Sequence, residues 1–308
     1  MKAEPLTKFW SLMHSVILEI WEITEPFIED AAVKNDIPIE LYFYSELGLE
    51  YFSVKDFQKR DPFSNPEQFE KMFVRFDVKG WIFPMPDDRY QVSNKAKDAV
   101  RKIIQTGDEH LEAFVLMSGT ELRQLAGLLK QLKTANLDAP EPPEKWAILS
   151  RFRVADEKSS PIVQVRELLM DLFAYRDDSH LSAARPHFGG AGIVWNVLGA
   201  IEQGSAVNAG QMVESMAFRG YDDKDYEVAI QAARELGWAE AADTPNSYRL
   251  TQSGKDLREK VETQTDEYFY RPWSVLAQDE IDTLFSLLTK LRDGLVSHRK
   301  SDSGESHL

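Results

Sequence analysis

The stretch DTPNSYRLTQSGKDL, residues 243–257, decides the fold because an earlier part of the chain repeats its pattern. Residues 85–99 read MPDDRYQVSNKAKDA, and a Gly-Trp pair precedes each of the two stretches. The separation between matched residues stays at 157 or 158 positions, about half of the chain. The matched residues are Tyr90 and Tyr248, Val92 and Leu250, Ser93 and Thr251, Lys97-Asp98 and Lys255-Asp256, and Gly80-Trp81 and Gly237-Trp238.

The sequences that flank these stretches match as well. Upstream, FEKMFVRFDVKGW (69–81) corresponds to YEVAIQAARELGW (226–238), with an aromatic residue first and apolar residues at helical spacing. Downstream, Asp108-Glu109 corresponds to Asp266-Glu267, and the leucine-rich run 122–132 corresponds to 281–291. The separation changes by one residue at a time, as insertions in loops produce. The sequence therefore predicts an internal duplication.

The order of elements in each copy predicts a winged helix. Apolar spacing, a proline at the start of a helix (Pro66) and the Gly-Trp pairs indicate three helices, a strand, a turn, a second strand and a further helix. In this arrangement the turns at 86–88 and 243–246 are the tips of the wings. We therefore expect a mainly α fold with small β wings, in which two winged-helix copies pack as an intramolecular pseudo-dimer.

Length and composition fit two domains that each have a core. The chain has 308 residues, of which 43% are hydrophobic and 28% are charged. We predict a first copy with an N-terminal helix at 1–133, a proline-rich linker at 134–161, a second copy at 162–296, and a disordered tail at 297–308. There is no cysteine, which excludes disulfides and thiolate sites. No apolar run indicates a signal peptide or a membrane span, and we expect a cytoplasmic protein, either a monomer or a homodimer.

Three motifs resemble a known family. They are LGLEYFSVKDFQKRDPF (47–63), YRDDSHLSAARPHFGGAGIVW (175–195) and GWAEAADTPNSYRLTQSGKDLREKVETQTDEYFYRPW (237–273). The chain resembles the actinobacterial tandem winged-helix proteins, which are described as helix-turn-helix or SalK-like proteins and are distantly MarR-like. The resemblance covers most of residues 20–295 and is weaker in the first copy. It implies a transcriptional regulator that binds DNA.

Charge opposes tight DNA binding. The formal net charge is −15, and the helix before the second wing begins with acidic residues at 222–225. Acidic residues at that position also have a structural explanation, because they interact favourably with the helix dipole. We expect weak DNA binding through a surface that has partly lost its function. The candidate DNA-binding residues are Gln68, Lys71, Arg75, Arg89, Lys224, Arg234 and Arg249.

A small apolar ligand is the second expected partner, in a chain that has lost DNA binding and serves as a ligand-binding or protein-interaction module. Aromatic residues are dense at 42–52, and Trp195 lies in a glycine-rich helix, so they could line a pocket for a flat molecule. Aromatic residues in such a pattern more often belong to the core of a Trp-rich helical protein. His180 lies near Asp177 and Asp178, whose carboxylates could orient an imidazole as a metal ligand or an acid–base group, but a lone histidine at the end of a helix is more often a capping or packing residue. The candidate pocket residues are Tyr42, Tyr44, Tyr51, His180 and Trp195.

Motifs of catalysis are missing from the sequence. The glycine-rich stretch 189–192 lacks the lysine and the preceding strand of a phosphate-binding loop, and there is no G-x-S-x-G motif. Asp108-Glu109-His110 contains possible metal ligands, but its counterpart ends in Tyr268, which favours a role in stability. We therefore expect no enzymatic activity, no cofactor and no bound metal.

Overall fold

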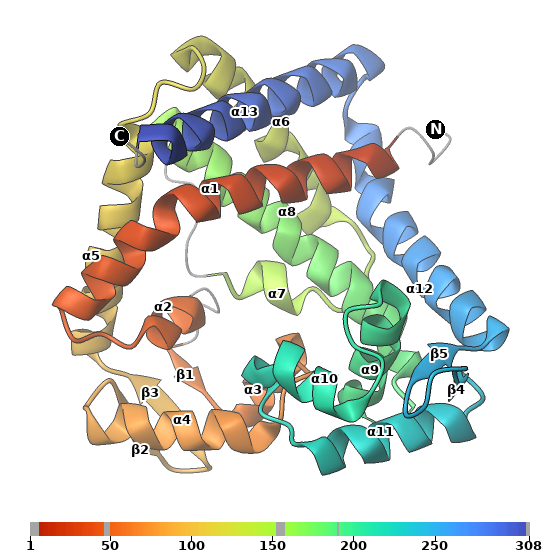
Figure 1. Ribbon diagram of the computed structural model, residues 1–308. Coiled ribbons are helices and arrows are strands. Elements are labelled where there is room, and N and C mark those ends of the chain that lie inside the picture. The colour runs from red at the N-terminus through yellow and green to blue at the C-terminus, as the bar shows by residue number, and fades with distance from the viewer. Residues whose placement is uncertain (1–5, 46–49, 152–157, 190, 306–308) are drawn as a thin grey trace. The chain divides into compact units, whose positions relative to one another are not determined.

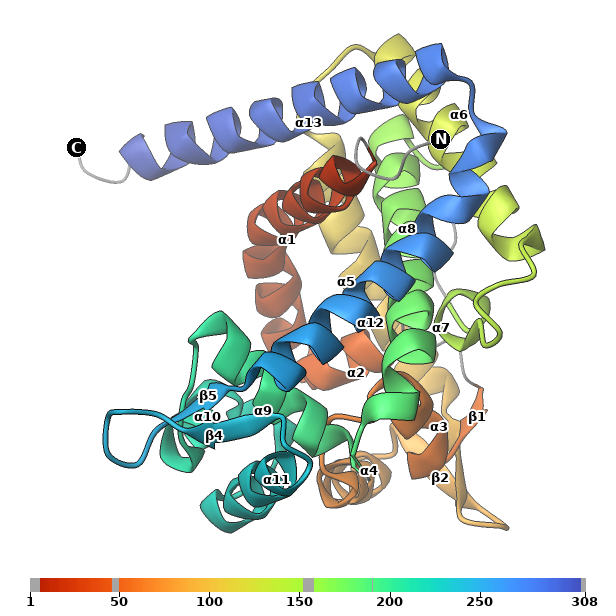
Figure 2. The same ribbon diagram turned by 90° about the vertical axis from the view of Figure 1, so that its right-hand side faces the viewer.

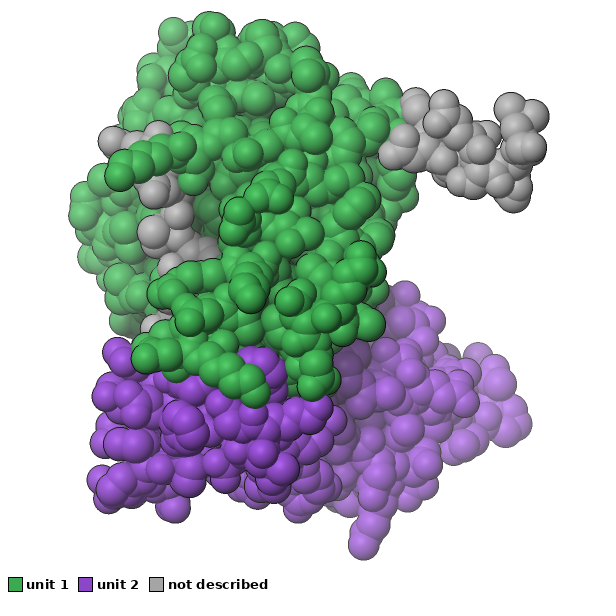
Figure 3. Space-filling model, turned by 90° about the vertical axis from the view of Figure 1, so that its left-hand side faces the viewer, with its two compact units in different colours: residues 1–49, 94–178, 266–308 green, residues 50–93, 179–265 purple. Residues whose placement is uncertain are grey.

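The computed structural model describes residues 6–45, 50–151, 158–189 and 191–305, and these are mainly helical (Figure 1). The chain forms two compact units, which Figure 3 shows in different colours. Unit 1 comprises residues 1–49, 94–178 and 266–308, and unit 2 comprises residues 50–93 and 179–265. This division differs from the one expected from the sequence, since each predicted copy contributes residues to both units. The reason is that the helices α5 (Asn94–Glu112) and α12 (Gln252–Tyr270), which follow the two predicted wings, lead the chain back into unit 1.

Unit 1 is built from helices. Two of its helices are shared with unit 2, because α8 and α12 contribute residues to both. The elements are α1 (Thr7–Lys34), α2 (Ile39–Ser45), α5 (Asn94–Glu112), α6 (Gly119–Asp138), α7 (Trp146–Leu149), α8 (Pro161–Ala184), α12 (Gln252–Tyr270), the 3-10 helix η3 (Arg271–Val275) and α13 (Gln278–Glu305).

The core of unit 1 combines leucines of α6 and α13 with apolar residues of α1 and α8. Trp273 is fully buried, and the ring of Phe9 packs against it edge to face at 5.0 Å. The long helix α1 fits this role because its apolar residues recur at three- and four-residue intervals and form one buried face. Helix α6 begins at a capping box in which Ser118 and Glu121 satisfy the free backbone N–H groups.

Two segments at the ends of the predicted copies contain helix, and residues 306–308 of the expected tail lie outside the described residues. Residues 297–305 are helical, where the sequence predicted a disordered tail, because α13 continues to Glu305. Arg299 of this helix pairs with Glu19 and Glu22 of α1, which gives the polar sequence fixed partners. The expected linker at 134–161 also contains regular structure. Its short helix α7 buries Ala147 and Ile148 in the core of unit 1.

Unit 2 contains two segments that share the order helix, helix, strand, strand, and we call them the first hairpin segment (50–93) and the second hairpin segment (191–265). The first has β1 (Tyr51–Phe52), α3 (Val54–Arg60), α4 (Pro66–Val78), β2 (Ile82–Met85) and β3 (Arg89–Val92), with the strands in the order β1-β3-β2. The second has α9 (Gly192–Gln203), α10 (Ala209–Ser215), the 3-10 helix η2 (Ala217–Arg219), α11 (Asp223–Glu235), β4 (Ala239–Ala241) and β5 (Tyr248–Leu250). The 3-10 helix η1 (Arg185–His187) precedes α9.

The two hairpin segments agree in detail. Helices α4 and α11 both have 13 residues, and α3 and α10 both have 7. Antiparallel pairing joins β2 to β3 and β4 to β5, and Tyr90 and Tyr248 both lie in the second strand, as the sequence predicted. In the second segment the backbone of Val207 accepts a hydrogen bond from Tyr248 at 2.9 Å, where the first segment has the short strand β1.

Candidate nucleic-acid interface

The helix before each hairpin is held by the same local devices. The side chain of Asn65 caps α4 by accepting from the backbone of Glu67, and Asp222 caps α11 by accepting from the backbone of Asp225. Each helix ends at a glycine with a left-handed backbone, Gly80 at φ 71° and Gly237 at φ 74°. The buried residues of the two helices are spaced identically. They are Phe69, Met72, Phe73 and Phe76 in α4, and Tyr226, Ala229, Ile230 and Ala233 in α11.

The tip of the first hairpin is a tight turn. Residues 86–88 connect Met85 to its strand partner Arg89, and Asp87 and Asp88 in this turn have positive φ angles of 67° and 55°, a conformation that aspartate tolerates. Arg89 follows at the start of β3 and is exposed. In the second hairpin the Ser247 hydroxyl donates to the carbonyl of Thr244 at 2.6 Å and closes a longer loop. The two tips therefore differ in length and in shape.

The outer face of α4 carries few free charges. Lys71 lies 3.4 Å from Glu67 one turn earlier, which compensates part of its charge. Two apolar side chains lie on the same exposed side, Val74 at 59% exposure and Val78 at 81%. Arg75 is exposed beside them. This face therefore mixes apolar, acidic and basic groups.

The outer face of α11 and its hairpin is more strongly compensated. Arg234 donates to the Gln231 side chain at 3.1 Å and lies over the ring of Tyr248. Arg249 donates to Glu240 at 2.9 Å across the hairpin and lies 3.6 Å from Asp243. Exposed Lys224 lies between Asp223 and Asp225 in the first turn. The guanidinium groups that could contact phosphates thus have partners within the protein.

The two hairpin segments contact each other just before α4 and α11. The backbone N–H of Asn65 donates to the carbonyl of Arg219 at 2.8 Å, and the Asn65 side chain donates to the carbonyl of Gly220 at 3.1 Å. The Gln68 side chain donates to the carbonyl of Phe218 at 2.8 Å. Figure 1 shows α4 and α11 extending away from this contact in opposite directions. Residues at the N-terminal ends of both helices are therefore part of a contact within unit 2.

The candidate DNA-binding residues lie on equivalent elements of the two segments. The α4 residues share one helix with an exposed face, but Gln68 points its amide at the second segment. The other six candidates are charged, and their side chains are exposed. Gln68, Lys71 and Arg75 lie on α4, Arg89 on β3, Lys224 and Arg234 on α11, and Arg249 on β5.

The candidate pocket residues do not form one group. Tyr42 lies in α2 of unit 1, and Tyr44 lies in the same helix, although its side chain is outside the described part of the structure. Tyr51 is an exposed residue of β1 whose hydroxyl accepts from Gln91 at 3.1 Å. The other two residues do meet, because Trp195 Nε1 donates to His180 Nε2 at 3.3 Å.

The surroundings of Trp195 and His180 are those of a packed site. Trp195 is buried, and the Arg258 guanidinium lies over its ring at 4.5 Å (Figure 2 shows the helices α9 and α12 that carry them). The Thr265 hydroxyl lies 3.4 Å from the second ring nitrogen of His180. The Asp178 carboxylate accepts from the backbone N–H groups of Ala147 and Ile148, at 2.7 and 2.9 Å. The Asp178 carboxylate thus binds the backbone of α7.

A buried ion network in unit 1 was missed by sequence reasoning. Arg151, which follows α7, donates to Asp171 and to Glu167 of α8, both at 2.7 Å. Lys133 also lies 2.6 Å from Asp171, yet burial outweighs both cations and raises the pKa of the Asp171 carboxyl. The alternation of charged and apolar residues in RELLMDL (166–172) is the only signal of such a network in the sequence.

The comparisons with known proteins give one match. A family model with the description helix-turn-helix family matches residues 155–300. No similar protein was found among curated proteins or among solved structures. The matched part includes the whole second hairpin segment and the helix α12 that follows its hairpin. Residues 155–300 thus match a helix-turn-helix family, which suggests a DNA-binding, regulator-like protein.

Proposed function

We propose that this chain is a winged-helix, transcriptional-regulator-like protein in which two winged-helix copies form an intramolecular pseudo-dimer, and that it binds DNA weakly. The observation that carries the proposal is the helix–strand–strand unit that occurs twice, with α4 and α11 of equal length and equal burial pattern. The helix-turn-helix family match, which includes the second hairpin segment, supports the same proposal. In proteins of this kind the helix before the wing enters the major groove.

Weak binding follows from the charges on the two surfaces. Affinity for DNA depends mainly on how many phosphates the protein neutralises with free lysine and arginine side chains. Arg249 and Arg234 are occupied by partners within the second hairpin segment. Binding to phosphates would have to break these contacts first. The first segment should contribute more of the affinity, because the acidic residues of its helix α4 are balanced by lysine and arginine, whereas α11 begins with acidic residues.

The test is a titration of fluorescent genomic DNA fragments at several salt concentrations, read by anisotropy and by mobility shift. We expect at best micromolar affinity, with a shallow slope of about −0.9 in log affinity against log salt for each phosphate contact. The double variant Arg75→Ala/Arg89→Ala should weaken binding more than the matched double variant Lys224→Ala/Arg249→Ala. Nanomolar binding at physiological salt would overturn the weak-binding proposal. No binding even at low salt would overturn DNA binding itself.

A second candidate function is favoured by a specific observation. Val74, Val78 and Val228 are 59%, 81% and 63% exposed on α4 and α11, where a base-reading helix needs polar side chains. Under this alternative, the chain is a protein-interaction or ligand-binding module that has lost DNA binding. Two results together would support this alternative. DNA would show no mobility shift, and a partner that binds the unaltered chain would not bind the Val78→Asp variant. In both cases we propose a binding protein and not an enzyme.

A further inference from the structure

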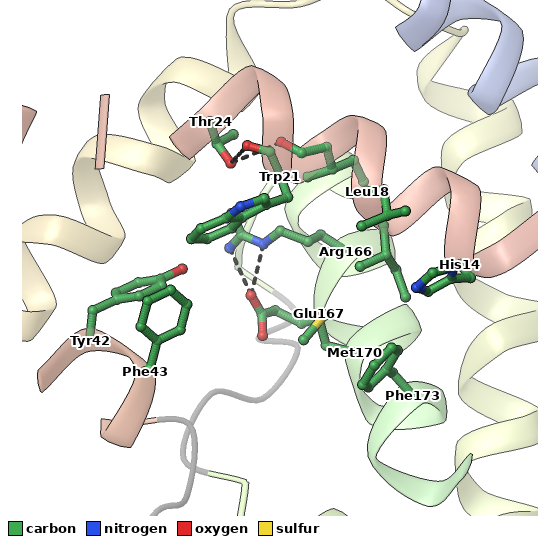
Figure 4. A pocket seen from close by; sticks show the side chains of 12 residues that line it. His14, Leu18, Trp21, Thr24, Tyr42, Phe43, Arg166, Glu167, Met170 and Phe173 are labelled. Atoms are coloured by element: carbon green, nitrogen blue, oxygen red, sulfur yellow. Dashed lines mark hydrogen bonds and ion pairs between the residues drawn. The ribbon is translucent and has the colours of Figure 1, made fainter. Parts of the chain in front are cut away.

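Unit 1 contains a cavity of about 260 Å³ between α1, α2 and the part of α8 that belongs to this unit. Figure 4 shows side chains from these three helices converging on it. Its walls are mainly apolar and aromatic, with Ile17 and Trp21 from α1, Phe43 from α2, and Met170 and Phe173 from α8. Walls of this composition, with a small number of polar groups, are typical of small-molecule sites.

The aromatic walls favour a flat ligand. Trp21 packs against the rings of Tyr42 and Phe43, with centroids 6.2 and 5.6 Å apart. At another part of the lining, the imidazole of His14 stacks on Phe173 at 6.2 Å. The cavity is also open, since Leu18 and Phe43 are 46% and 48% exposed. Its volume lies just below the roughly 300–1,000 Å³ of pockets for drug-sized molecules, so a smaller, fused-ring molecule is the better fit.

The charged groups at the cavity already compensate each other. Glu167 lies 2.7 Å from Arg166 through one oxygen and 2.7 Å from Arg151 through the other, and Arg166 also lies 2.5 Å from Asp108. A charged ligand would lose its water here without gaining an unpaired partner, which is costly in a buried site. The cavity therefore favours an uncharged ligand.

Two polar groups remain for hydrogen bonds with a ligand. Within the part of the chain that the structure describes, neither the Trp21 indole nor the His14 imidazole forms a side-chain hydrogen bond or ion pair, and both side chains are half-buried. The indole N–H can only donate, whereas an imidazole nitrogen can donate or accept. A hydroxyl group on the ligand could accept from Trp21 at one end of the cavity or donate to His14 at the other.

We propose that this cavity binds an uncharged, planar bicyclic aromatic molecule that carries a hydroxyl or a comparable hydrogen-bonding group. The binding site lies wholly in unit 1, so it does not depend on the DNA-binding proposal. Its ligand stacks beside Trp21 and Phe173 and leaves the Arg166–Glu167 pair intact. Binding can be measured without DNA, and the failure of either proposal can therefore be told apart from the failure of the other.

The experiment is isothermal titration calorimetry of the full chain with three probes that share one ring system. These are 2-naphthol, which is neutral and has a hydroxyl, 2-naphthoate, which is charged, and naphthalene, which has no polar group. We expect 2-naphthol to bind at least about tenfold more tightly than 2-naphthoate, because the carboxylate must be desolvated without a free partner. Equal affinities for these two probes, or no binding of 2-naphthol, would overturn the proposal.

Variants locate the site. Trp21→Phe keeps an aromatic ring but removes the N–H, so the affinity for 2-naphthol should fall about fivefold while that for naphthalene stays within about twofold. Leu18→Trp should narrow the opening and weaken both probes. The matched control is Leu236→Trp, because Leu236 is 45% exposed and lies in unit 2. If Leu236→Trp weakens binding as much as Leu18→Trp, or Leu18→Trp has no effect, the probe binds elsewhere and the assignment fails.

Discussion

The Arg219 guanidinium lies 2.6 Å from the Asp61 carboxylate and joins the second hairpin segment to the first. The same nitrogen donates to the Ser64 hydroxyl at 3.2 Å. The guanidinium also lies over the rings of Phe63 and Phe218, at 5.6 and 4.7 Å from their centroids. One side chain thus combines ionic, hydrogen-bonding and cation–π contacts where α4 and α11 begin.

Arg219→Ala should loosen this contact between the segments. The pair is partly exposed, so solvent screening limits its own contribution, and we expect a loss of about 1–2 kcal/mol in the free energy of unfolding with the ring contacts included. Amide hydrogen exchange should accelerate at 61–68 and 217–222. Arg292→Ala is the control, since Arg292 pairs only with its exposed neighbour Asp293 in the described contacts and should change little. Unchanged exchange in Arg219→Ala would contradict the assigned role.

The two tryptophans of the Gly-Trp pairs should differ in their contribution to stability. Trp81 is 4% exposed, whereas Trp238 is half-buried. Trp81→Ala should cost about 3–5 kcal/mol, as truncation of a buried aromatic residue does, and Trp238→Ala should cost less. Urea unfolding of both variants gives the comparison. If Trp238→Ala lowered the free energy of unfolding more than Trp81→Ala, exposure would not determine which tryptophan contributes more to stability.

Gly192 lies where a side chain has no room. A Cβ atom at this position would lie 2.1 Å from the backbone oxygen of Pro62, so Gly192→Ala must displace the backbone and should cost about 1–3 kcal/mol. Gly127 is the matched control within α6, because a Cβ there would meet no atom within 4 Å among the described residues. Gly127→Ala should stabilise the protein by about 0.5–1 kcal/mol. Thermal unfolding should move in opposite directions for the two variants.

The pH dependence of stability should include a contribution from Glu121. Hydrogen bonds from Lys290 and Ser118 lower the pKa of this carboxyl to about 2, below the value of about 4.3 in an unfolded chain. A lowered pKa stabilises the folded state above the unfolded value, and the stabilisation is lost as the pH falls toward 2. Glu121→Gln should therefore lower the melting temperature at pH 7 and have a much smaller effect near pH 2. An equal difference at both pH values would show that the charge of Glu121 is not responsible.

The sequence predicted the hairpin units well because their determinants are local. Gly80 and Gly237 end their helices with the same left-handed backbone, and the matched residues after them form the strands. The pattern of buried residues in α4 and α11 also follows from helical spacing alone. The packing of the two copies as a pseudo-dimer stays a prediction, as does the set of DNA-binding residues.

The division into units and the cavity could not be predicted in the same way. Periodicity shows that α1 and α8 have buried residues, but it does not show which helices meet. The cavity in unit 1 joins residues as distant in sequence as Trp21 and Met170, and of the candidate pocket residues only Tyr42 lines it among those whose side chains are described. Arg151 lies in the segment that the sequence predicted to be a linker. Its ion pairs with Glu167 and Asp171 depend on how the helices pack, which the sequence does not show.

The contact between Asn65 and Arg219 joins parts of a single polypeptide, and this has a consequence for how the protein can change over time. In a symmetric assembly of identical subunits, every substitution appears on both sides of the contact at once. Here a substitution in α4 leaves α11 unaltered, so each half can acquire its own chemistry while the other preserves the fold. The buried residues at corresponding positions already differ in size, since Met72 and Phe76 of α4 correspond to Ala229 and Ala233 of α11. Under the proposed function, the two segments could therefore contact two unlike half-sites.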